Sequence, residues 1–365
     1  MSSQRHGVAV VGCGSMGQAY IRAYDTYPDT ELIALAEHNP DRRRAVGEHF
    51  GVGAVYPDVE ALRRAHTPDI VAIITPSKYY KEAVVACAEA GVRGLSTDKP
   101  IAAKLADADA MVDVCERHGV VYAGGNLMRA RDDLHHVATR LHAGEFGDVV
   151  GASLRCWGAM EISGGGCQQV SVLRLLLDAE VEEVITWGEP EDLVAGSARD
   201  EGQKFHGRLR MANGIEVPLY WPEELACDVD VWTKTARIVA RNGEPAIYQG
   251  FDDRGNRTPV EQEYPPFDWS EFGYLTGSIR SLIAAVEAVA SGTSPAAATH
   301  SLRISGHDLR QALEVAIAAK VSAQRGSVPI TLPLRDRSRA LYPTAYRWLG
   351  GDATDRAAGQ MLFVD

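Results

Sequence analysis

Long apolar runs and paired cysteines are both missing from this sequence of 365 residues. No stretch approaches the roughly 18 consecutive apolar residues that a membrane-spanning helix needs. The six cysteines are scattered and no two form a Cys-x-x-Cys pair, so neither a disulfide framework nor a structural zinc site is expected. Residues 1–7 are polar and lead directly into a strand pattern, which argues against a signal peptide and favours a cytoplasmic protein.

Basic residues are outnumbered, with 37 lysines and arginines against 49 aspartates and glutamates and a net charge of −12. Such a chain repels nucleic acid and anionic membranes at long range, so neither is an expected partner. Hydrophobic residues make up 45% and charged residues 24% of the sequence, which is typical of a globular protein. The length suits two domains.

Residues 1–126 alternate short apolar runs with stretches of helical periodicity. The predicted strands are Val8–Val11, Glu31–Ala36, Ile70–Ile74, Gly94–Ser96 and Val120–Ala123, and the predicted helices are Met16–Tyr27, Pro40–Phe50, Val59–Ala65, Lys81–Ala90 and Leu105–His118. This alternation predicts an α/β domain of the Rossmann type, in which helices cover both faces of a doubly wound parallel sheet.

Residues 127–343 change character, because strand-like runs follow one another with little helix between them. The predicted strands are Val149–Trp157, Val184–Trp187, Asp192–Ser197, Phe205–Met211, Ile215–Trp221, Asp228–Thr233, Ala236–Arg241 and Ala246–Gln249, and the predicted helices are Leu134–Ala143, Gln169–Leu177, Tyr274–Ala290 and Ser301–Arg325. Asn-Gly at 213–214 and 242–243 indicates hairpin turns. The pattern predicts a C-terminal α/β domain with a large open, mostly antiparallel sheet. Residues 344–365 form a tail that folds back or meets a partner subunit.

A glycine pattern lies between the first predicted strand and helix, in VAVVGCGSMG. Gly12 permits a tight turn, Gly14 lets the backbone approach a pyrophosphate, and Gly17 allows close packing of helix on strand. The pyrophosphate would lie on the helix N-terminus, where free N–H groups and the helix dipole favour negative charge. Ser15 and Met16 open that helix and are expected to share in cofactor binding.

An acid, Glu37, ends the second predicted strand 20 residues after Gly17. Its carboxylate can accept hydrogen bonds from the adenosine ribose hydroxyls and would repel a 2′-phosphate. The sequence therefore predicts NAD as the cofactor. NADP stays possible, because His38, Arg42 and Arg43 follow and could neutralise a 2′-phosphate.

Residues 73–102, IITPSKYYKEAVVACAEAGVRGLSTDKPIA, resemble the signature of the Gfo/Idh/MocA (glucose–fructose oxidoreductase / inositol dehydrogenase / rhizopine catabolism) family. The order of elements over roughly residues 7–335 is similar as well. The resemblance implies that Thr75 and Pro76 line the nicotinamide pocket. It also implies that Lys99, in an Asp98-Lys99-Pro100 triplet where the family has Glu-Lys-Pro, lies near the nicotinamide ribose and the substrate.

A lysine at this position suits the expected chemistry. A cation beside the substrate hydroxyl lowers the cost of alkoxide character, and the neighbouring Asp98 carboxylate keeps Lys99 charged and oriented. NLMR at 126–129 resembles the family's Asn and Arg at the crossover between domains. Asn126 is therefore expected to contact the cofactor, and Arg129 either borders the substrate pocket or has a structural role.

The second domain departs from the family pattern Asp-x-Gly-x-His-x-x-Asp-x-x-Arg. The matching run is GGGCQQVSVLR at 164–174, which places Gly164 at the first Asp, Gln168 at the His that commonly serves as acid and base, and Ser171 at the later Asp. Glutamine forms hydrogen bonds but has no useful pKa near neutrality. Gln168 is therefore expected to orient the substrate, with Tyr80 and Arg129 as further candidates for substrate contact.

Three explanations for this departure stay open. Lys99 can act as the acid and base itself in a closed site, Tyr79 or Tyr80 can do so, or the protein binds the dinucleotide without turnover. Glu161, just before the glycine run, is expected to be a solvated acid at the end of a strand. The spacing of His135, His136, His300 and His307 does not suit a zinc site, and no metal is expected.

The resemblance implies an oxidoreductase that moves hydride between a nicotinamide cofactor and a hydroxyl or ketone of a sugar, amino-sugar or cyclitol. It further implies a homodimer or homotetramer. Independently, a wide sheet covered on one face only exposes an apolar patch, which favours association. Two alternatives are a sensor of the same fold that binds NAD(P) without catalysis, and an enzyme that keeps NAD bound and uses transient oxidation for elimination or epimerisation.

Overall fold

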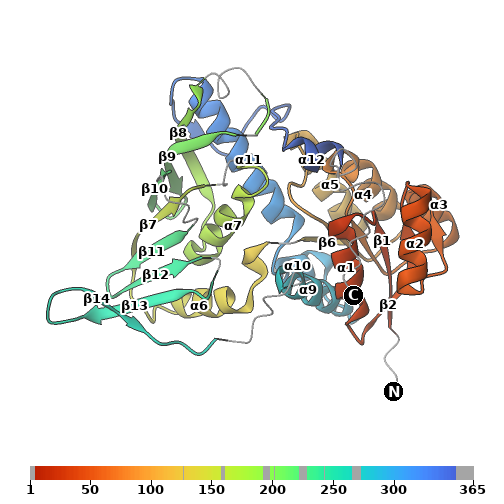
Figure 1. Cartoon of the computed structure of the whole chain (residues 1–365). Helices are drawn as coiled ribbons and strands as arrows, with labels where there is room; N and C mark the ends of the chain where they lie inside the picture. The colour runs from red at the N-terminus through yellow and green to blue at the C-terminus, as the bar shows by residue number, and fades with distance from the viewer. Residues whose placement is uncertain are drawn as a thin grey trace. The chain divides into compact units, whose positions relative to one another are not determined.

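The computed structural model describes residues 5–125, 127–157, 161–191, 198–200, 202–221, 228–241, 243–264 and 273–350 (Figure 1). The chain divides into two compact units. Unit 1 comprises residues 1–126, 268–310 and 345–365, and unit 2 comprises residues 127–267 and 311–344. Among the described helices, none combines the length and the apolar character that crossing a membrane requires.

A six-stranded parallel sheet forms the centre of unit 1, with the strand order β3-β2-β1-β4-β5-β6. Its strands are β1 (His6–Val11), β2 (Thr30–Ala36), β3 (Val55–Tyr56), β4 (Ile70–Ile73), β5 (Gly94–Thr97) and β6 (Val121–Gly124). The predicted doubly wound parallel sheet is confirmed. Sequence patterning did not identify β3, because two residues are too few to form a pattern.

The helices of unit 1 connect these strands. They are α1 (Ser15–Asp25), α2 (Pro40–Phe50), α3 (Val59–Ala65), α4 (Tyr80–Glu89) and α5 (Leu105–His118), with the short η1 (Ser77–Tyr79) before α4. Local chemistry determines the ends of α2: the Asn39 side chain accepts hydrogen bonds from the first-turn amides, and Gly51 ends the helix at φ +68°. These helices lie within a few residues of their predicted bounds.

Three later elements also belong to unit 1, namely α9 (Gly273–Ala290), α10 (Pro295–His300) and α12 (Ala345–Leu349). Helix α9 contacts α1, β5 and β6, and its Ile279, Leu282 and Val286 join the same hydrophobic core as Val8 of β1. The sequence-based boundaries, 1–126 and 127–343, assumed one continuous segment per domain. The chain instead returns to the first unit, because the apolar face of α9 is buried there.

Unit 2 is built on a nine-stranded sheet with the order β14-β13-β12-β11-β7-β10-β9-β8-β15. The strands are β7 (Val149–Arg155), β8 (Val181–Glu189), β9 (Lys204–Met211), β10 (Glu216–Tyr220), β11 (Val229–Thr233), β12 (Ala236–Ala240), β13 (Ala246–Phe251), β14 (Arg257–Val260) and β15 (Ile330–Thr331). All neighbours are antiparallel except β10 and β7. The predicted mostly antiparallel sheet is confirmed, and so is the hairpin turn at 213–214 between β9 and β10.

The structure also contains the helices η2 (Met128–Ala130), α6 (Asp132–His142), α7 (Gly166–Leu177) and α11 (Gly306–Gln324). Figure 1 shows α7 beside β11, with which it is in contact. The predicted helix Ser301–Arg325 was too long at its start. Ser305 and Asp308 exchange side-chain to backbone hydrogen bonds, an arrangement that begins α11 at Gly306. The predicted strand Asp192–Ser197 and Asn242 lie outside the described residues.

Candidate functional site

Four predicted cofactor segments follow four strands of the parallel sheet in unit 1. Gly12 follows β1, Glu37 follows β2, Thr75 comes shortly after β4, and Asp98 follows β5. The carboxyl ends of parallel strands meet at one edge of a sheet. Strands β1 and β4 are neighbours at the point where the strand order reverses, which is where doubly wound sheets bind ligands.

The three glycines of the turn after β1 are required for different reasons. Gly12 has φ +91°, and a Cβ there would lie 2.6 Å from the Ile74 carbonyl oxygen. A Cβ on Gly17 would lie 1.9 Å from the Gly12 carbonyl oxygen. Both glycines are therefore needed by the protein's own packing. Gly14 has φ −69°, and a Cβ there would meet nothing within 4 Å, so the space beside it is open to a ligand.

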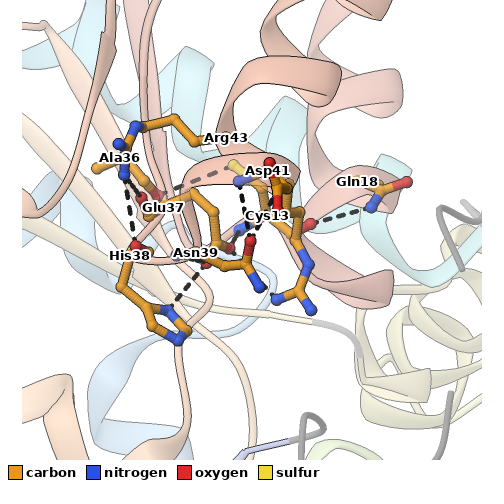
Figure 2. Close-up of polar contacts among 9 residues, drawn as sticks. Cys13, Gln18, Ala36, Glu37, His38, Asn39, Asp41 and Arg43 are labelled. Carbon is orange, nitrogen blue, oxygen red and sulfur yellow. Dashed lines mark hydrogen bonds and ion pairs between the residues drawn. The ribbon is translucent and has the colours of Figure 1, made fainter. Parts of the chain in front are cut away.

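The N-terminus of α1 opens at this turn. Gly14 is its N-cap and provides no side-chain hydrogen bond, and the first helical bond runs from the Gln18 N–H to the Gly14 carbonyl oxygen. The Gln18 side-chain amide donates to the Cys13 carbonyl oxygen at 2.9 Å and steadies the turn (Figure 2). Ser15 and Met16 contribute the first backbone amides of this helix, a suitable arrangement for a pyrophosphate.

Glu37 is 4% exposed, and its side chain forms hydrogen bonds with the glycine turn and with the backbone after β2. Its Oε2 accepts a hydrogen bond from the Cys13 N–H at 2.9 Å, and its Oε1 accepts one from the Asn39 N–H at 2.9 Å (Figure 2). The carboxylate is therefore held next to the backbone over which a dinucleotide would pass. Burial, followed by the Glu37 charge, raises the pKa of the Cys13 thiol well above its usual value, so this thiol stays neutral.

Three basic residues that follow Glu37 interact with Glu37 itself. An Arg42 guanidinium nitrogen lies 3.6 Å from Glu37 Oε2, and His38 Nδ1 lies 2.9 Å from Oε1. The Arg43 guanidinium donates to the Glu37 carbonyl oxygen at 2.7 Å. Because this carboxylate and its backbone already engage all three side chains, they are poorly placed to neutralise an added 2′-phosphate.

The loop after β4 is covered by the start of the C-terminal tail. The Ser77 hydroxyl donates to the Arg347 carbonyl oxygen at 3.1 Å, and a Cβ on Gly350 would lie 2.9 Å from the Pro76 ring. Helix α12 therefore folds back on the unit that carries Thr75 and Pro76, one of the two courses expected for the tail. Residues 351–365 lie outside the described residues.

The lysine after β5 is nearly buried. Its side chain is 9% exposed, and its Nζ lies 3.9 Å from Asp98 Oδ1, which also accepts the Lys99 N–H at 2.7 Å. Tyr80 is buried as well, and burial together with the Asp98 charge raises the pKa of its hydroxyl well above 10. Tyr79 is half exposed. A buried hydroxyl that keeps its proton is a poor base, so among these side chains Lys99 is the better candidate for proton transfer.

Two of the predicted substrate-contact residues, Gln168 and Arg129, lie in unit 2 and form hydrogen bonds with the backbone of that unit. Gln168 Oε1 accepts the Met128 N–H at 2.6 Å, and an Arg129 guanidinium nitrogen donates to the Ser171 carbonyl oxygen at 2.9 Å. Both bonds tie η2 to α7. Asn126, the remaining candidate, lies outside the described residues.

Glu161 is buried at 8% exposed, so the expectation of a solvated acid was wrong. A Cβ on Gly164 would lie 2.3 Å from Glu161 Oε2. The Glu161 carboxyl group therefore fills the space in which a side chain at position 164 would begin. Glycine at position 164 therefore leaves room for this carboxyl group.

Glu161 belongs to a buried polar cluster that sequence reasoning missed. Asp200 Oδ1 accepts the Ile162 N–H at 2.9 Å, and its Oδ2 accepts the Ser163 N–H. The Lys320 ammonium donates to the Gln203 side chain. These residues are brought together from distant parts of the sequence, and no local pattern signals them. Within the described ranges, no three His, Cys, Asp or Glu side chains are grouped so as to hold a metal ion.

Burial shifts the pKa values of two groups in this cluster, Asp200 and Lys320. Burial raises the pKa of the Asp200 carboxyl to about 7, and the Glu161 charge adds to the rise while the amides of residues 162 and 163 oppose it. Burial lowers the pKa of the Lys320 ammonium to about 8, against the opposing charge of Asp200. The cluster therefore exchanges protons in the physiological range.

These shifts predict how stability depends on pH. Between pH 3.8 and about 7 the folded state keeps the Asp200 proton while the unfolded state releases it. The free energy of unfolding should therefore fall as pH rises through this range, by up to about 1.4 kcal/mol per pH unit. Urea denaturation of the wild type and of Asp200→Asn should give curves whose difference has this slope, whereas exposed Asp148→Asn should parallel the wild type. Parallel curves for Asp200→Asn would contradict the assignment.

Comparison with known proteins agrees with this site. Residues 6–125 match the sequence model of a family described as an oxidoreductase family with an NAD-binding Rossmann fold. The D-apiose dehydrogenase of Paraburkholderia graminis is 34% identical over 139 residues, which is 38% of this chain and 37% of the relative. The D-glucoside 3-dehydrogenase of Escherichia coli is 28% identical over 178 residues, which is 46% of this chain and 50% of the relative.

The matched stretches span half or less of these two relatives, whereas similarity of fold extends further. An inositol dehydrogenase homolog from Azotobacter vinelandii, whose crystal structure contains NADH and myo-inositol, superposes with a TM-score of 0.74. The superposition covers 90% of this chain and 98% of that chain at 15% sequence identity. The architecture described for the two units therefore also occurs in a solved structure.

Proposed function

We propose, from the match of residues 6–125 to the sequence model of an oxidoreductase family with an NAD-binding Rossmann fold, that the protein is an NAD-dependent dehydrogenase or reductase of CH–OH groups of the Gfo/Idh/MocA family. Its substrate is a sugar, amino-sugar or cyclitol, as the names of the similar proteins suggest. The oxidised substrate is the corresponding ketone or lactone.

We place the activity in the cytoplasm, where thiols such as buried Cys13 stay reduced.

The observation that carries this proposal is the match between the turn after β1 and a dinucleotide. Gly14 leaves open space at the N-terminus of α1, where the pyrophosphate would bind, and Glu37 lies beside that turn, where it would accept hydrogen bonds from the adenosine ribose. Backbone amides of Ser15 and Met16 would hold the phosphates. Thr75 and Pro76, and Asn126 beyond the described residues, would border the nicotinamide.

The bound nicotinamide supplies the acceptor for the hydride that the substrate carbon loses. Oxidation also requires that the substrate hydroxyl give up a proton, and we assign Lys99 as the acceptor: its neutral amine would take the proton and become an ammonium beside the Asp98 carboxylate. Asp98 receives the Lys99 N–H and lies near its ammonium, so its charge orients the lysine. We also propose that Gln168 orients the substrate, with Tyr80 and Arg129 as further candidates for substrate contact.

Turnover with a substrate panel tests this function. The protein would be incubated with NAD and D-apiose, a D-glucoside, myo-inositol and related polyols, while NADH absorbance and substrate consumption are both recorded. Steady growth of NADH supports the dehydrogenase. Tight binding of NAD without turnover would favour a sensor, and substrate conversion without net NADH would favour elimination or epimerisation through transient oxidation.

Replacing Glu37 should change the choice of cofactor. In Glu37→Ser the hydrogen bonds to the ribose and the repulsion of a 2′-phosphate are both lost, while Arg42 is released. We expect the Kd for NAD to rise about tenfold and the Kd for NADP to fall, because each hydrogen bond to a charged group contributes about 1.5–3 kcal/mol. Calorimetric titration with both cofactors measures the change. Equal NAD affinity in the wild type and the variant would contradict the role given to Glu37.

We also propose that the protein is a homodimer or homotetramer. Large apolar side chains are exposed on five strands of the sheet in unit 2. They are Val150 of β7, Trp187 of β8, Tyr220 of β10, Phe251 of β13 and Val260 of β14. Exposed apolar surface of this kind favours association. Light scattering on the eluting protein measures the mass, and a monomer at micromolar concentration would refute this part of the proposal.

A further inference from the structure

The Glu37 carboxylate has a limited number of positions at which a ribose hydroxyl can bind. Each carboxylate oxygen accepts about two hydrogen bonds. The backbone takes one position on each oxygen, since the Cys13 N–H donates to Oε2 and the Asn39 N–H donates to Oε1, both at 2.9 Å. The Cys13 amide belongs to the glycine turn and Asn39 is the N-cap of α2, so both donors stay in place when a ligand binds. One further position is left on each oxygen.

The second position on Oε1 is occupied by a side chain. His38 Nδ1 lies 2.9 Å from Glu37 Oε1 (Figure 2), and an imidazole nitrogen at this distance from a carboxylate donates a hydrogen bond. The His38 side chain is 78% exposed, whereas that of Glu37 is 3% exposed. The buried acceptor is therefore paired with a donor that solvent reaches, and the ring can turn away without opening the protein core.

The second position on Oε2 is different. An Arg42 guanidinium nitrogen lies 3.6 Å from this oxygen, which is beyond the length of a hydrogen bond. The Arg42 side chain is 15% exposed and acts as a counter-charge to the carboxylate. A ribose hydroxyl can therefore donate to Oε2 beside Arg42, whereas at Oε1 it has to replace His38.

We propose that His38 competes with the adenosine ribose of NAD for Glu37 Oε1, so that the imidazole holds the place of one ribose hydroxyl until the cofactor binds. The inference rests on the proposed function and deepens it, because it concerns the affinity of the same cofactor site. A cofactor that has to displace an internal donor binds less tightly than Glu37 alone would allow. It is also released more readily, which suits a dehydrogenase that exchanges NAD for NADH in every turnover.

Calorimetric titration of the full chain with NAD tests the competition. His38→Ala removes the imidazole, and the Kd for NAD should fall about 3- to 10-fold, the factor that corresponds to one typical hydrogen bond. His38→Phe keeps a flat ring without the N–H and should show the same fall. The control is His118→Ala, which removes an exposed histidine in the last turn of α5 and should leave the Kd unchanged.

Cofactor analogues locate the competition at the ribose. The titrations of the wild type and of His38→Ala would be repeated with 2′-deoxy-NAD and 3′-deoxy-NAD, each of which lacks one hydroxyl of the adenosine ribose. The gain in affinity from His38→Ala should disappear with the analogue that lacks the hydroxyl bound to Oε1. A gain that persists with both analogues would show that the imidazole does not compete with a ribose hydroxyl, and the inference would be overturned.

Two other results would also overturn it. A Kd for NAD that is unchanged or higher in His38→Ala would mean that the imidazole is neutral towards the ribose or supports it. Wild-type affinity in His38→Phe, together with tighter binding by His38→Ala, would assign the effect to the bulk of the ring. In both cases NAD still binds and the dehydrogenase stands. If the wild type binds neither NAD nor NADP at millimolar concentration, the proposed function itself falls.

Discussion

Replacing Lys99 with alanine is expected to lower kcat by about 10²- to 10⁴-fold, the usual contribution of a positioned acid or base. The Kd for NAD should change little, because the glycine turn and Glu37 carry most of that binding. Among the candidates for proton transfer, Lys99 combines burial with an adjacent carboxylate. Gln168 cannot titrate near neutrality, and Tyr80 is buried with its hydroxyl pKa raised. Measurement of kcat and of the NAD dissociation constant on the same preparation separates the two effects.

Two controls make this test specific for a proton. Lys104→Ala removes an exposed lysine just before α5 and should leave kcat unchanged. Small primary amines added to Lys99→Ala should restore part of the lost rate, because they can enter the space of the missing side chain and carry the proton. If Lys99→Ala turns over at the wild-type rate, or if Tyr80→Phe produces the loss instead, the assignment of Lys99 is wrong.

The parts of this protein that could be predicted from sequence are those whose chemistry is local. The strand, glycine turn and helix around Gly12 lie within a few residues of one another, and Glu37 follows at the end of the next strand. Each of these features is visible in the sequence because one short segment determines it. The alternation of strands and helices predicted the parallel sheet for the same reason.

The features that sequence reasoning missed depend on contacts between distant segments. Glu161 lies against Gly164, but its carboxylate accepts the distant Thr344 N–H, and the Ile162 N–H that follows it donates to the distant Asp200. The hydrogen bond from the Met128 N–H to Gln168 Oε1 joins residues 40 positions apart. Such pairings are set by tertiary packing, which spacing and composition do not encode.

Gly14→Ala and Gly14→Val should abolish tight NAD binding while leaving the fold intact. The backbone at Gly14 has φ −69°, which any residue adopts, and an added Cβ meets no protein atom within 4 Å. The fold therefore gives no reason for glycine at this position. If a pyrophosphate lies on the N-terminus of α1, the added methyl group occupies its place, and we expect the Kd for NAD to rise about 100-fold or more, equivalent to about 2.7 kcal/mol.

Substitutions at two other glycines separate binding from folding. Gly51→Ala places a side chain at φ +68°, at the end of α2, and should lower the melting temperature without changing the Kd for NAD. Gly17→Ala should damage both, because its Cβ would lie 1.9 Å from the Gly12 carbonyl oxygen. Calorimetric titration and thermal unfolding of the variants at these three glycines give the comparison. A Gly14→Val protein that binds NAD as tightly as the wild type would mean that no phosphate passes over this glycine, and the cofactor would have to bind elsewhere.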